Sequence, residues 1–320
     1  MIPMQVNSTD ITFLVGNMTI LEQMSETPVL PIFSDGAVRF LNALSIALFK
    51  DNRAKKMQDV LSYAYWIRKA SLSAAKEKYN TEDVRLGRGV AVHFAPSNVP
   101  VNFAVSMTSS LLAGNLTVIR VSNKQFEAVD IIVDAINSIL NKECSDMKPY
   151  ICIIRYEHNE LITQELSSMC DIRIIWGGDG TIEEIRKASL PPRAVEMTFA
   201  DRFSLSIIDA DAYMTMDEVD VAKRFYTDTY YIDQNACSSP RLVVWIGKSV
   251  EKAKEKFWTA LGRLVQQDYD FKPKQAVDKL LAFSMLSMKK SGVKLESNEN
   301  RIVRILAPSL TSDLIYDTSI

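Results

Sequence analysis

Short apolar segments alternate with amphipathic helical segments through the middle of the chain, and this alternation limits the folds open to it. Strands are expected at GVAVHF, LTVIRV, YICIIRY and DIRIIW, and a helical pattern follows each of them. These strands are almost continuously apolar, which is typical of strands covered on both faces. We therefore predict parallel βαβ units and a doubly wound α/β sheet.

The flanking segments suggest three parts in a chain long enough for two hydrophobic cores. Residues 1–86 are expected to be a helical lead-in packed on the next domain, with one helix in FSDGAVRFLNALSIALFK and another over about Lys55–Tyr79. Residues 87–208 are expected to form a dinucleotide-binding domain. Residues 209–320 are expected to form a second α/β domain, in which a helix leads directly into Cys237 and the strand PRLVVWIG follows.

Composition argues against several classes of protein. The formal net charge is −2 and no long basic block occurs, so a nucleic-acid partner is not expected. No apolar run is long enough to cross a bilayer and the N-terminus lacks signal-peptide features, which predicts a cytoplasmic protein without a membrane span. The four cysteines and two histidines show no metal or disulfide spacing, so neither a metal site nor a Cys-His dyad is expected.

The segment IIWGGDGTIEEI carries a glycine-rich turn. A strand that opens through Gly177, Gly178 and Gly180 into a helix lets a phosphate approach backbone N–H groups. The structural alternative is a tight turn that needs glycine for its dihedral angles. The string Gly-Gly-Asp-Gly-Thr also occurs in NAD kinases and diacylglycerol kinases, so by itself it points two ways.

Asn98 follows the first predicted strand, in the segment HFAPSNVPVNF. Pro96 and Pro100 rigidify the loop around it. An asparagine amide held in this way can donate to an oxygen that becomes negative in a tetrahedral intermediate. The alternative is that Asn98 caps a helix that begins near Val101.

Polar residues also end the next strand, in VIRVSNK. Arg120, Ser122, Asn123 and Lys124 include two cations and no carboxylate. Cations at this place in a dinucleotide fold suit the 2′-phosphate of NADP, whereas an acidic residue suits the 2′-hydroxyl of NAD. A solvated strand end is the alternative.

Cys237 stands in DQNACSSPRL, between a polar stretch and an apolar strand. Polar neighbours in a loop could stabilise its thiolate. A buried, unreactive cysteine is the other interpretation.

These motifs occur together in one order. The phrases APSNVPVNF, LLAGN, IIWGGDGTI and DQNACSSPRL resemble the LuxC-type acyl-CoA reductases of the aldehyde dehydrogenase superfamily, and the likeness is best over 87–247. The resemblance implies an aldehyde dehydrogenase-like fold. It also implies NADPH-dependent reduction of a long-chain fatty acyl-CoA or acyl-protein thioester to fatty aldehyde, for luminescence or another pathway.

The resemblance assigns roles to individual residues. Cys237 would be the nucleophile that takes the acyl group as a thioester, and Asn98 with the N–H of Cys237 would form an oxyanion hole. Where many aldehyde dehydrogenases hold a ribose-binding glutamate this chain has Asn123, in agreement with NADPH. The implied cofactor-binding residues are Pro96, Ser97, Arg120, Ser122, Asn123, Gly177, Gly178 and Thr181.

The chain departs from the family pattern at two places. Glu196 in RAVEMTFAD lies near the position of the base of hydrolytic aldehyde dehydrogenases, but the Leu-Gly-Gly that surrounds that base is absent. A reductase needs no such base, so Glu196 is a candidate by position alone. Full-length family members are longer, and we expect the catalytic domain to be incomplete at its C-terminal side.

Partners and alternatives follow from the same resemblance. Fatty acyl-CoA, an acyl-protein synthetase and, at full length, further copies of the chain are the implied partners. An NAD(P)-dependent aldehyde dehydrogenase that uses Glu196 and a catalytically idle scaffold stay open. A kinase rests on the glycine string alone and explains neither Asn98 nor Cys237.

Overall fold

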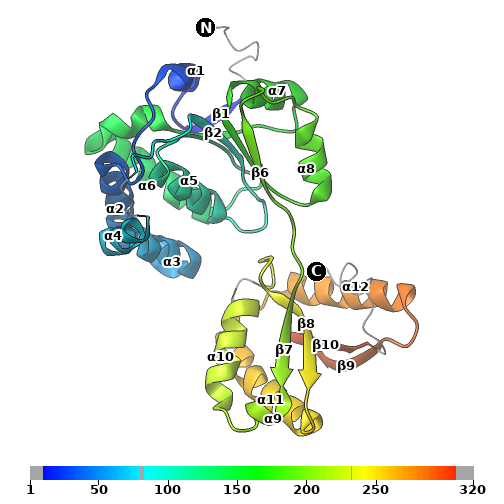
Figure 1. The fold of residues 1–320 in the computed structure, drawn as a ribbon. Coiled ribbons are helices and arrows are strands. Elements are labelled where there is room, and N and C mark those ends of the chain that lie inside the picture. The colour runs from blue at the N-terminus through cyan, green and yellow to red at the C-terminus, as the bar shows by residue number, and fades with distance from the viewer. Residues whose placement is uncertain (1–9, 80–82, 232, 308–320) are drawn as a thin grey trace. The chain divides into compact units, whose positions relative to one another are not determined.

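Figure 1 shows a computed structural model of the protein, which describes residues 10–79, 83–231 and 233–307. The chain forms two compact units, Met1–Asp201 and Arg202–Ile320. The division lies earlier than the boundary expected after residue 208, because Ser204–Asp209 is a strand that pairs with a later strand of the second unit.

A six-stranded sheet forms the centre of the first unit. Its order is β1-β4-β3-β2-β5-β6, and β1 is its antiparallel member. Going out from β2, the chain adds β3 and β4 on one side and then β5 and β6 on the other, as in doubly wound sheets. The predicted doubly wound α/β fold is thereby confirmed. The strands are β1 (Thr12–Val15), β2 (Val90–Phe94), β3 (Leu116–Arg120), β4 (Ile151–Arg155), β5 (Ile172–Trp176) and β6 (Val195–Phe199).

Helices cover both faces of this sheet (Figure 1). On one face lie α2 (Asp35–Lys50), α3 (Gln58–Trp66), α4 (Lys69–Lys78), α5 (Asn102–Leu112) and α6 (Glu127–Lys142). On the other lie α1 (Met18–Gln23), α7 (Glu160–Met169) and α8 (Asp179–Arg186). Short 3-10 turns are η2 (Met24–Glu26), η3 (Ala54–Lys56) and η4 (Ser145–Tyr150). The lead-in helices therefore belong to the core of the first unit.

Two positions next to these helices have particular backbone conformations. Gly114, which follows the helix before β3, has φ 86° directly after the C-cap Ala113. A Cβ there would lie 2.0 Å from the main-chain oxygen of Leu30, so the position also needs glycine for space. The helical stretch expected over about Lys55–Tyr79 is two helices, because Arg68 is extended, with ψ 150°.

The second unit is built on two parallel strands, β7 (Ser204–Asp209) and β8 (Pro240–Ile246). Tyr213, Phe225 and Phe257 meet edge to face in its core, with the ring centroids of Phe225 and Phe257 5.1 Å apart. The helix expected to lead directly into Cys237 ends at Thr229, and a turn separates the two. The other elements are α9 (Ala210–Tyr213), α10 (Glu218–Thr229), α11 (Val250–Asp268), α12 (Pro273–Lys289), β9 (Lys294–Glu299) and β10 (Ile302–Leu306).

The described helices do not meet the requirements for crossing a membrane. None of those described combines the length and the apolar character that a bilayer crossing requires.

A buried ion pair joins β5 to β6. Arg173 is 3% exposed, and its Nε donates to Oε2 of Glu196 at 2.8 Å. The same guanidinium donates to the main-chain oxygens of Ile185 and Ala188, at 3.2 and 2.7 Å, where α8 ends. Arg186 completes the cluster through a 2.6 Å contact with Oε1 of Glu196. The cluster therefore fixes strand pairing and the end of a helix at once.

Both carboxylate oxygens of Glu196, a candidate base by position, accept hydrogen bonds within this cluster. Burial alone would raise its pKa, but the hydrogen bonds from Arg186 and Arg173 outweigh burial and hold the pKa of Glu196 below its ordinary value. A carboxylate that two guanidinium groups hold in its ionised form is a poor acceptor for the proton of a water molecule. The structure therefore explains Glu196 as part of the packing of the first unit.

Replacing Arg173 should destabilise the first unit strongly. Arg173→Met leaves buried carbonyl oxygens and one side of Glu196 without their donor, so we expect a loss of about 3 kcal/mol in the free energy of unfolding. The matched control is Arg186→Met, which removes an exposed partner of the same carboxylate and should cost less than about 1 kcal/mol. Urea denaturation followed by circular dichroism measures both, and equal losses would contradict the assignment.

The effect should also depend on pH. Because the pKa of Glu196 is lower in the folded state, its stabilisation is complete above the ordinary glutamate pKa of about 4.3 and is lost as pH falls through the folded-state pKa. The difference between wild type and Arg173→Met should therefore shrink in acid.

Candidate functional site

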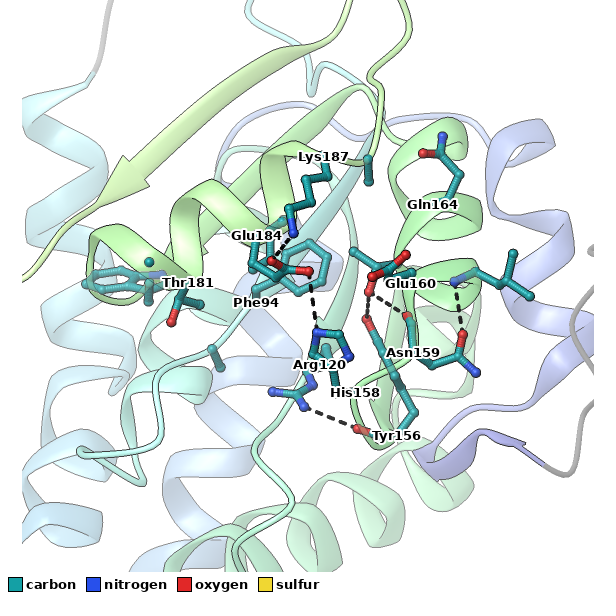
Figure 2. Close-up of a pocket in the computed structure, with 17 residues that line it drawn as sticks. Phe94, Arg120, Tyr156, His158, Asn159, Glu160, Gln164, Thr181, Glu184 and Lys187 are labelled. Carbon is teal, nitrogen blue, oxygen red and sulfur yellow. Dashed lines mark hydrogen bonds and ion pairs between the residues drawn. The ribbon is translucent and has the colours of Figure 1, made fainter.

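The carboxyl ends of β2, β3, β4 and β5 open onto a cleft between α7 and α8 (Figure 2). Its volume is about 670 Å³, a size typical of small-molecule sites. Phe94, Arg120 and Trp176 line it from the strand ends, and Tyr156 lines it just after β4. The cleft lies beside the point where the strand order reverses, which is where open parallel sheets bind ligands.

Arg120 supplies a positive charge to this cleft (Figure 2). Its Nη2 donates to the main-chain oxygen of Tyr156 at 3.2 Å. Its guanidinium carbon lies 5.3 Å from the centre of the Tyr156 ring. Burial lowers the pKa of Arg120, but arginine starts from so high a value that the group stays charged at neutral pH. The cleft therefore presents a cation that is partly removed from water.

The glycine turn borders the cleft through Gly180 and Thr181, whereas Gly177 and Gly178 do not line it. Gly178 is the N-cap residue of α8, and the N–H of Gly177 donates to the main-chain oxygen of Phe199 at 3.2 Å. A Cβ on Gly177 would lie 3.0 Å from the side chain of Thr181, so close packing favours glycine there. Thr181 and Gly180 line the cleft. The turn thus meets the structural need for glycine and also borders the cleft.

Four other predicted cofactor residues lie in the loops that follow β2 and β3. Ser122 is half-buried and its Oγ accepts the N–H of Lys124 at 3.2 Å, whereas Asn123 is exposed. Pro96 and Ser122 border a small cavity of about 10 Å³, so the two loops lie side by side. Among the described residues that line the larger cleft, Pro96, Ser97, Ser122 and Asn123 do not occur. Of the predicted cofactor residues, Arg120 and Thr181 therefore line the cleft, whereas these four and the two glycines Gly177 and Gly178 do not.

Asn98 is exposed in the bend between β2 and α5. Helix α5 has Val101 as its N-cap residue, without a side-chain cap. This assignment does not test whether Asn98 caps the helix, so the capping interpretation stays open. The oxyanion role of Asn98 stays a prediction.

Cys237 is exposed in the turn before β8. The N–H of Ser239 donates to the main-chain oxygen of Ala236 at 3.0 Å, which closes that turn. Ser204 on β7 donates its hydroxyl to the main-chain oxygen of Cys237 at 2.8 Å. Cys237 therefore lies in a polar loop at the surface of the second unit, and the interpretation as a buried core cysteine is excluded.

The other three cysteines are buried. Burial raises the pKa of Cys152 to about 12 and that of Cys170 to about 11. Thiols with such values stay protonated at neutral pH and react slowly. All four cysteines are described, so Cys237 is the one thiol of the chain that is open to solvent.

The cleft contains charged residues that sequence reasoning missed. Lys187 and Glu184, both from the α8 side, pair at 2.5 Å. His158, which precedes α7, lies 3.6 Å from Glu184. The hydrogen bond from Lys187 lowers the pKa of Glu184. Glu184 and Lys187 are three residues apart, so the predicted helix GTIEEIRKAS already grouped them, whereas His158 joins them only in the folded chain.

Two aromatic residues of the cleft could have been found from sequence. Tyr156 and Trp176 stand at the ends of YICIIRY and DIRIIW, where the strand-end argument that identified Arg120 also applies. Trp176 is held in place because its Nε1 donates to Ser106 at 3.1 Å and its ring stacks on Phe199 with centroids 4.0 Å apart.

The described residues offer no metal site. Within 10–79, 83–231 and 233–307, no three His, Cys, Asp or Glu side chains gather as ligands would. His93 is buried with its Nδ1 2.7 Å from the hydroxyl of Ser106, and burial lowers its pKa to about 3, so it is neutral.

Sequence comparison relates the chain to one family. The model of the acyl-CoA reductase (LuxC) family matches residues 21–297. Curated relatives include long-chain acyl-protein thioester reductase 2 of Photobacterium leiognathi, 27% identical over 206 residues that make up 62% of this chain and 40% of the relative. The reductase of Aliivibrio fischeri is 29% identical over 165 residues, which make up 51% of this chain and 33% of the relative. The chain thus spans about two fifths or less of the length of these two relatives.

Structural comparison gives the fold. A lactaldehyde dehydrogenase matches with a TM-score of 0.63 at 14% identity, over 87% of this chain and 63% of that one. A putative aldehyde dehydrogenase from Burkholderia cenocepacia matches with a TM-score of 0.58 at 15% identity, over 85% and 64% of the two chains. The chain therefore has an aldehyde dehydrogenase-like fold, as the motifs implied.

The exposure of Cys237 predicts the pattern of thiol labelling. Brief treatment of the native chain with iodoacetamide should add one carbamidomethyl group at Cys237, because the other thiols are shielded and burial raises their pKa values. The same treatment in guanidinium chloride should add four. Peptide mass spectrometry locates the label, and Cys237→Ser should take up none when native. Comparable labelling of Cys144 in the native chain would contradict the prediction.

Proposed function

Because the chain belongs to the acyl-CoA reductase (LuxC) family, we propose that it serves in the NADPH-dependent reduction of a long-chain fatty acyl thioester to fatty aldehyde. The observation that carries the proposal is the exposed thiol of Cys237 in a polar turn, in a chain whose other cysteines are buried. The names of the curated relatives, long-chain acyl-protein thioester reductases, agree with a thiol that accepts acyl groups.

Cys237 is the proposed nucleophile. Its thiolate attacks the carbonyl carbon of the acyl thioester, a new C–S bond forms, and the carrier leaves as a thiol. Asn98 and the N–H of Cys237 are the proposed donors to the oxygen that becomes negative during this attack. The acyl group is then held on the enzyme as a thioester, which splits one difficult reaction into two easier ones. When the aldehyde leaves, the sulfur of Cys237 is again a thiol.

The cleft of the first unit is the proposed nucleotide site. Arg120 offers a partly desolvated cation, and Ser122 and Asn123 follow it without a carboxylate, which suits a phosphate on the ribose. Gly177, Gly178 and Thr181 are the proposed neighbours of the pyrophosphate, with Pro96 and Ser97 at the adjoining loop. Bound NADPH supplies the hydride that reduces the acyl group.

Aldehyde oxidation is less well supported as a function. It needs a base to activate water for release of the acyl group, and the candidate Glu196 is paired with Arg173 and Arg186. The family match covers the glycine string as well as Cys237, so a kinase is not proposed.

The proposal extends to carriers, assembly and location. Coenzyme A and an acyl-carrying protein such as a synthetase are the proposed donors, and a homo-oligomer is proposed for the full-length protein. Four free cysteines suit a reducing compartment, so we propose the cytoplasm.

Acyl transfer to Cys237 can be measured directly. Intact-mass spectrometry after mixing the chain with tetradecanoyl-CoA should show one acyl adduct on wild type and none on Cys237→Ser, because the hydroxyl is a far weaker nucleophile. Cys170→Ser removes a buried thiol and should behave as wild type. Addition of NADPH should discharge the adduct.

Other outcomes separate the alternatives. An adduct that NADPH leaves in place would mean that acylation is present and the reductive half is not. No adduct from coenzyme A, but one from an acyl-carrying protein, would identify the donor. No adduct from either donor would favour a catalytically idle scaffold.

Cofactor preference should depend on Arg120. Arg120→Met removes a charged donor and should weaken NADPH binding by about tenfold or more, with a smaller effect on NADH. Asn123→Glu should favour NADH over NADPH, because a carboxylate accepts from a ribose hydroxyl and repels a phosphate. Isothermal titration calorimetry measures both dissociation constants. The control Lys124→Met removes a nearby exposed cation, and an equal loss there would argue against a specific role for Arg120.

A further inference from the structure

The turn that leads to Cys237 contains two consecutive non-glycine residues in the left-handed region. Asp233 has φ 51° and Gln234 has φ 57°. Such angles cost free energy for residues with a Cβ and persist where surrounding contacts impose them. Their N–H groups fold back on the end of α10, from Asp233 to Tyr230 at 3.1 Å and from Gln234 to Thr229 at 2.8 Å. Main-chain hydrogen bonds to the end of α10 therefore hold the backbone just before the thiol in this conformation.

Residues that follow Cys237 in the chain contact this turn through the carboxylate of Asp233. The hydroxyl of Tyr269, the C-cap residue of α11, donates to its Oδ1. Nζ of Lys279, from the middle of α12, lies 3.8 Å from the same oxygen. Residues from α11 and α12, which both follow Cys237, thus contact the same carboxylate oxygen of Asp233, which precedes it.

Lys279 is an unusual residue in the second unit because its charge is buried. Its side chain is 5% exposed, and Nζ donates to the hydroxyl of Tyr269 at 3.2 Å and to the main-chain oxygen of Arg301 at 3.0 Å. Nζ also lies 5.3 Å from the centre of the Phe271 ring. A buried ammonium requires a countercharge, and Asp233 is the carboxylate beside it. The buried ammonium of Lys279 therefore favours the conformation in which the Asp233 carboxylate lies beside it.

We propose that Asp233, Tyr269 and Lys279 position Cys237 for acyl transfer by holding the turn that precedes it. The three residues act through the main chain and not by contact with the acyl group. On the other side, the hydroxyl of Ser204 holds the carbonyl of Cys237, so the thiol lies between two anchored points. The inference rests on the proposed role of Cys237 as nucleophile.

Hydrogen exchange tests the anchoring without any activity. In Lys279→Met the amides of Asp233 and Gln234 should exchange at least about tenfold faster than in wild type, because the turn opens locally once its ion pair is gone. Lys274→Met is the matched control. It removes a lysine of the same helix whose side chain is 83% exposed, and its turn should exchange as in wild type.

Two reactions of Cys237 test the positioning. With tetradecanoyl-CoA, Lys279→Met should lower the maximal acylation rate about tenfold or more and leave the half-saturating concentration unchanged, since orientation and not binding is lost. Alkylation by iodoacetamide, a small reagent that needs no defined orientation, should change by less than about twofold.

Substitutions of Asp233 test the other half of the ion pair. Asp233→Asn tolerates the left-handed backbone and keeps an acceptor for Tyr269, but it removes the countercharge of Lys279, so its acylation rate should fall about as far as in Lys279→Met. Asp233→Ala also removes the acceptor and should lower the rate at least as much. A wild-type acylation rate in either Asp233 variant would overturn the inference.

The remaining outcomes are also decisive. Wild-type exchange and acylation rates in Lys279→Met would overturn the inference. If that variant does not fold, Tyr269→Phe, which lacks one hydroxyl, takes its place in both measurements. If wild type takes up no acyl group, the proposed function has failed, and the exchange of the turn alone then supports or overturns the anchoring.

Discussion

The pairing of β2 with β3 and β5 is the constraint on which the first unit depends. Strand β2 is buried along its whole length, and its register sets Phe94 opposite Arg120 on one side and opposite Ile175 on the other. Because these strands are parallel, their carboxyl ends reach one edge of the sheet. The helices that follow β2 and β5, α5 and α8, pack on opposite faces. The cleft lies beside this reversal of the strand order, on the face that carries α7 and α8, and Arg120 and Thr181 line it.

Much of this arrangement could be predicted from local sequence. The central strands are continuously apolar because helices cover both of their faces, so their positions and their parallel order followed from pattern alone. The edge strands are different. In β6 and β7 half-buried and exposed residues alternate, and the exposed positions include Met197 and Ile207. Neither strand was expected, although VEMTF and SLSI alternate apolar and polar residues with the period of two that is typical of a strand.

The turn before Cys237 shows a second limit of sequence reasoning. The pattern of α10 continues past Thr229, where the helix ends, and nothing local to Asp233 or Gln234 predicts a left-handed backbone. Their conformation depends on Tyr269 and Lys279, which lie in α11 and α12. Sequence could therefore identify the cysteine and its polar neighbours, whereas the way in which the loop is held needed the folded chain.

Among the described residues two cationic side chains are buried, Arg173 in the first unit and Lys279 in the second, and the same physical argument applies to both. Arg173 and Lys279 each combine one carboxylate with main-chain oxygens, so that nearly every donor of the buried group is used. Such pairs add little net stability relative to apolar packing, because removing the charges from water costs about as much as their attraction returns. Such pairs instead fix the relative positions of the two side chains, since moving one partner away would leave the other charge buried without compensation. Arg173 therefore explains why Glu196 is a structural residue, and the same reasoning makes Lys279 informative about the turn that carries Cys237.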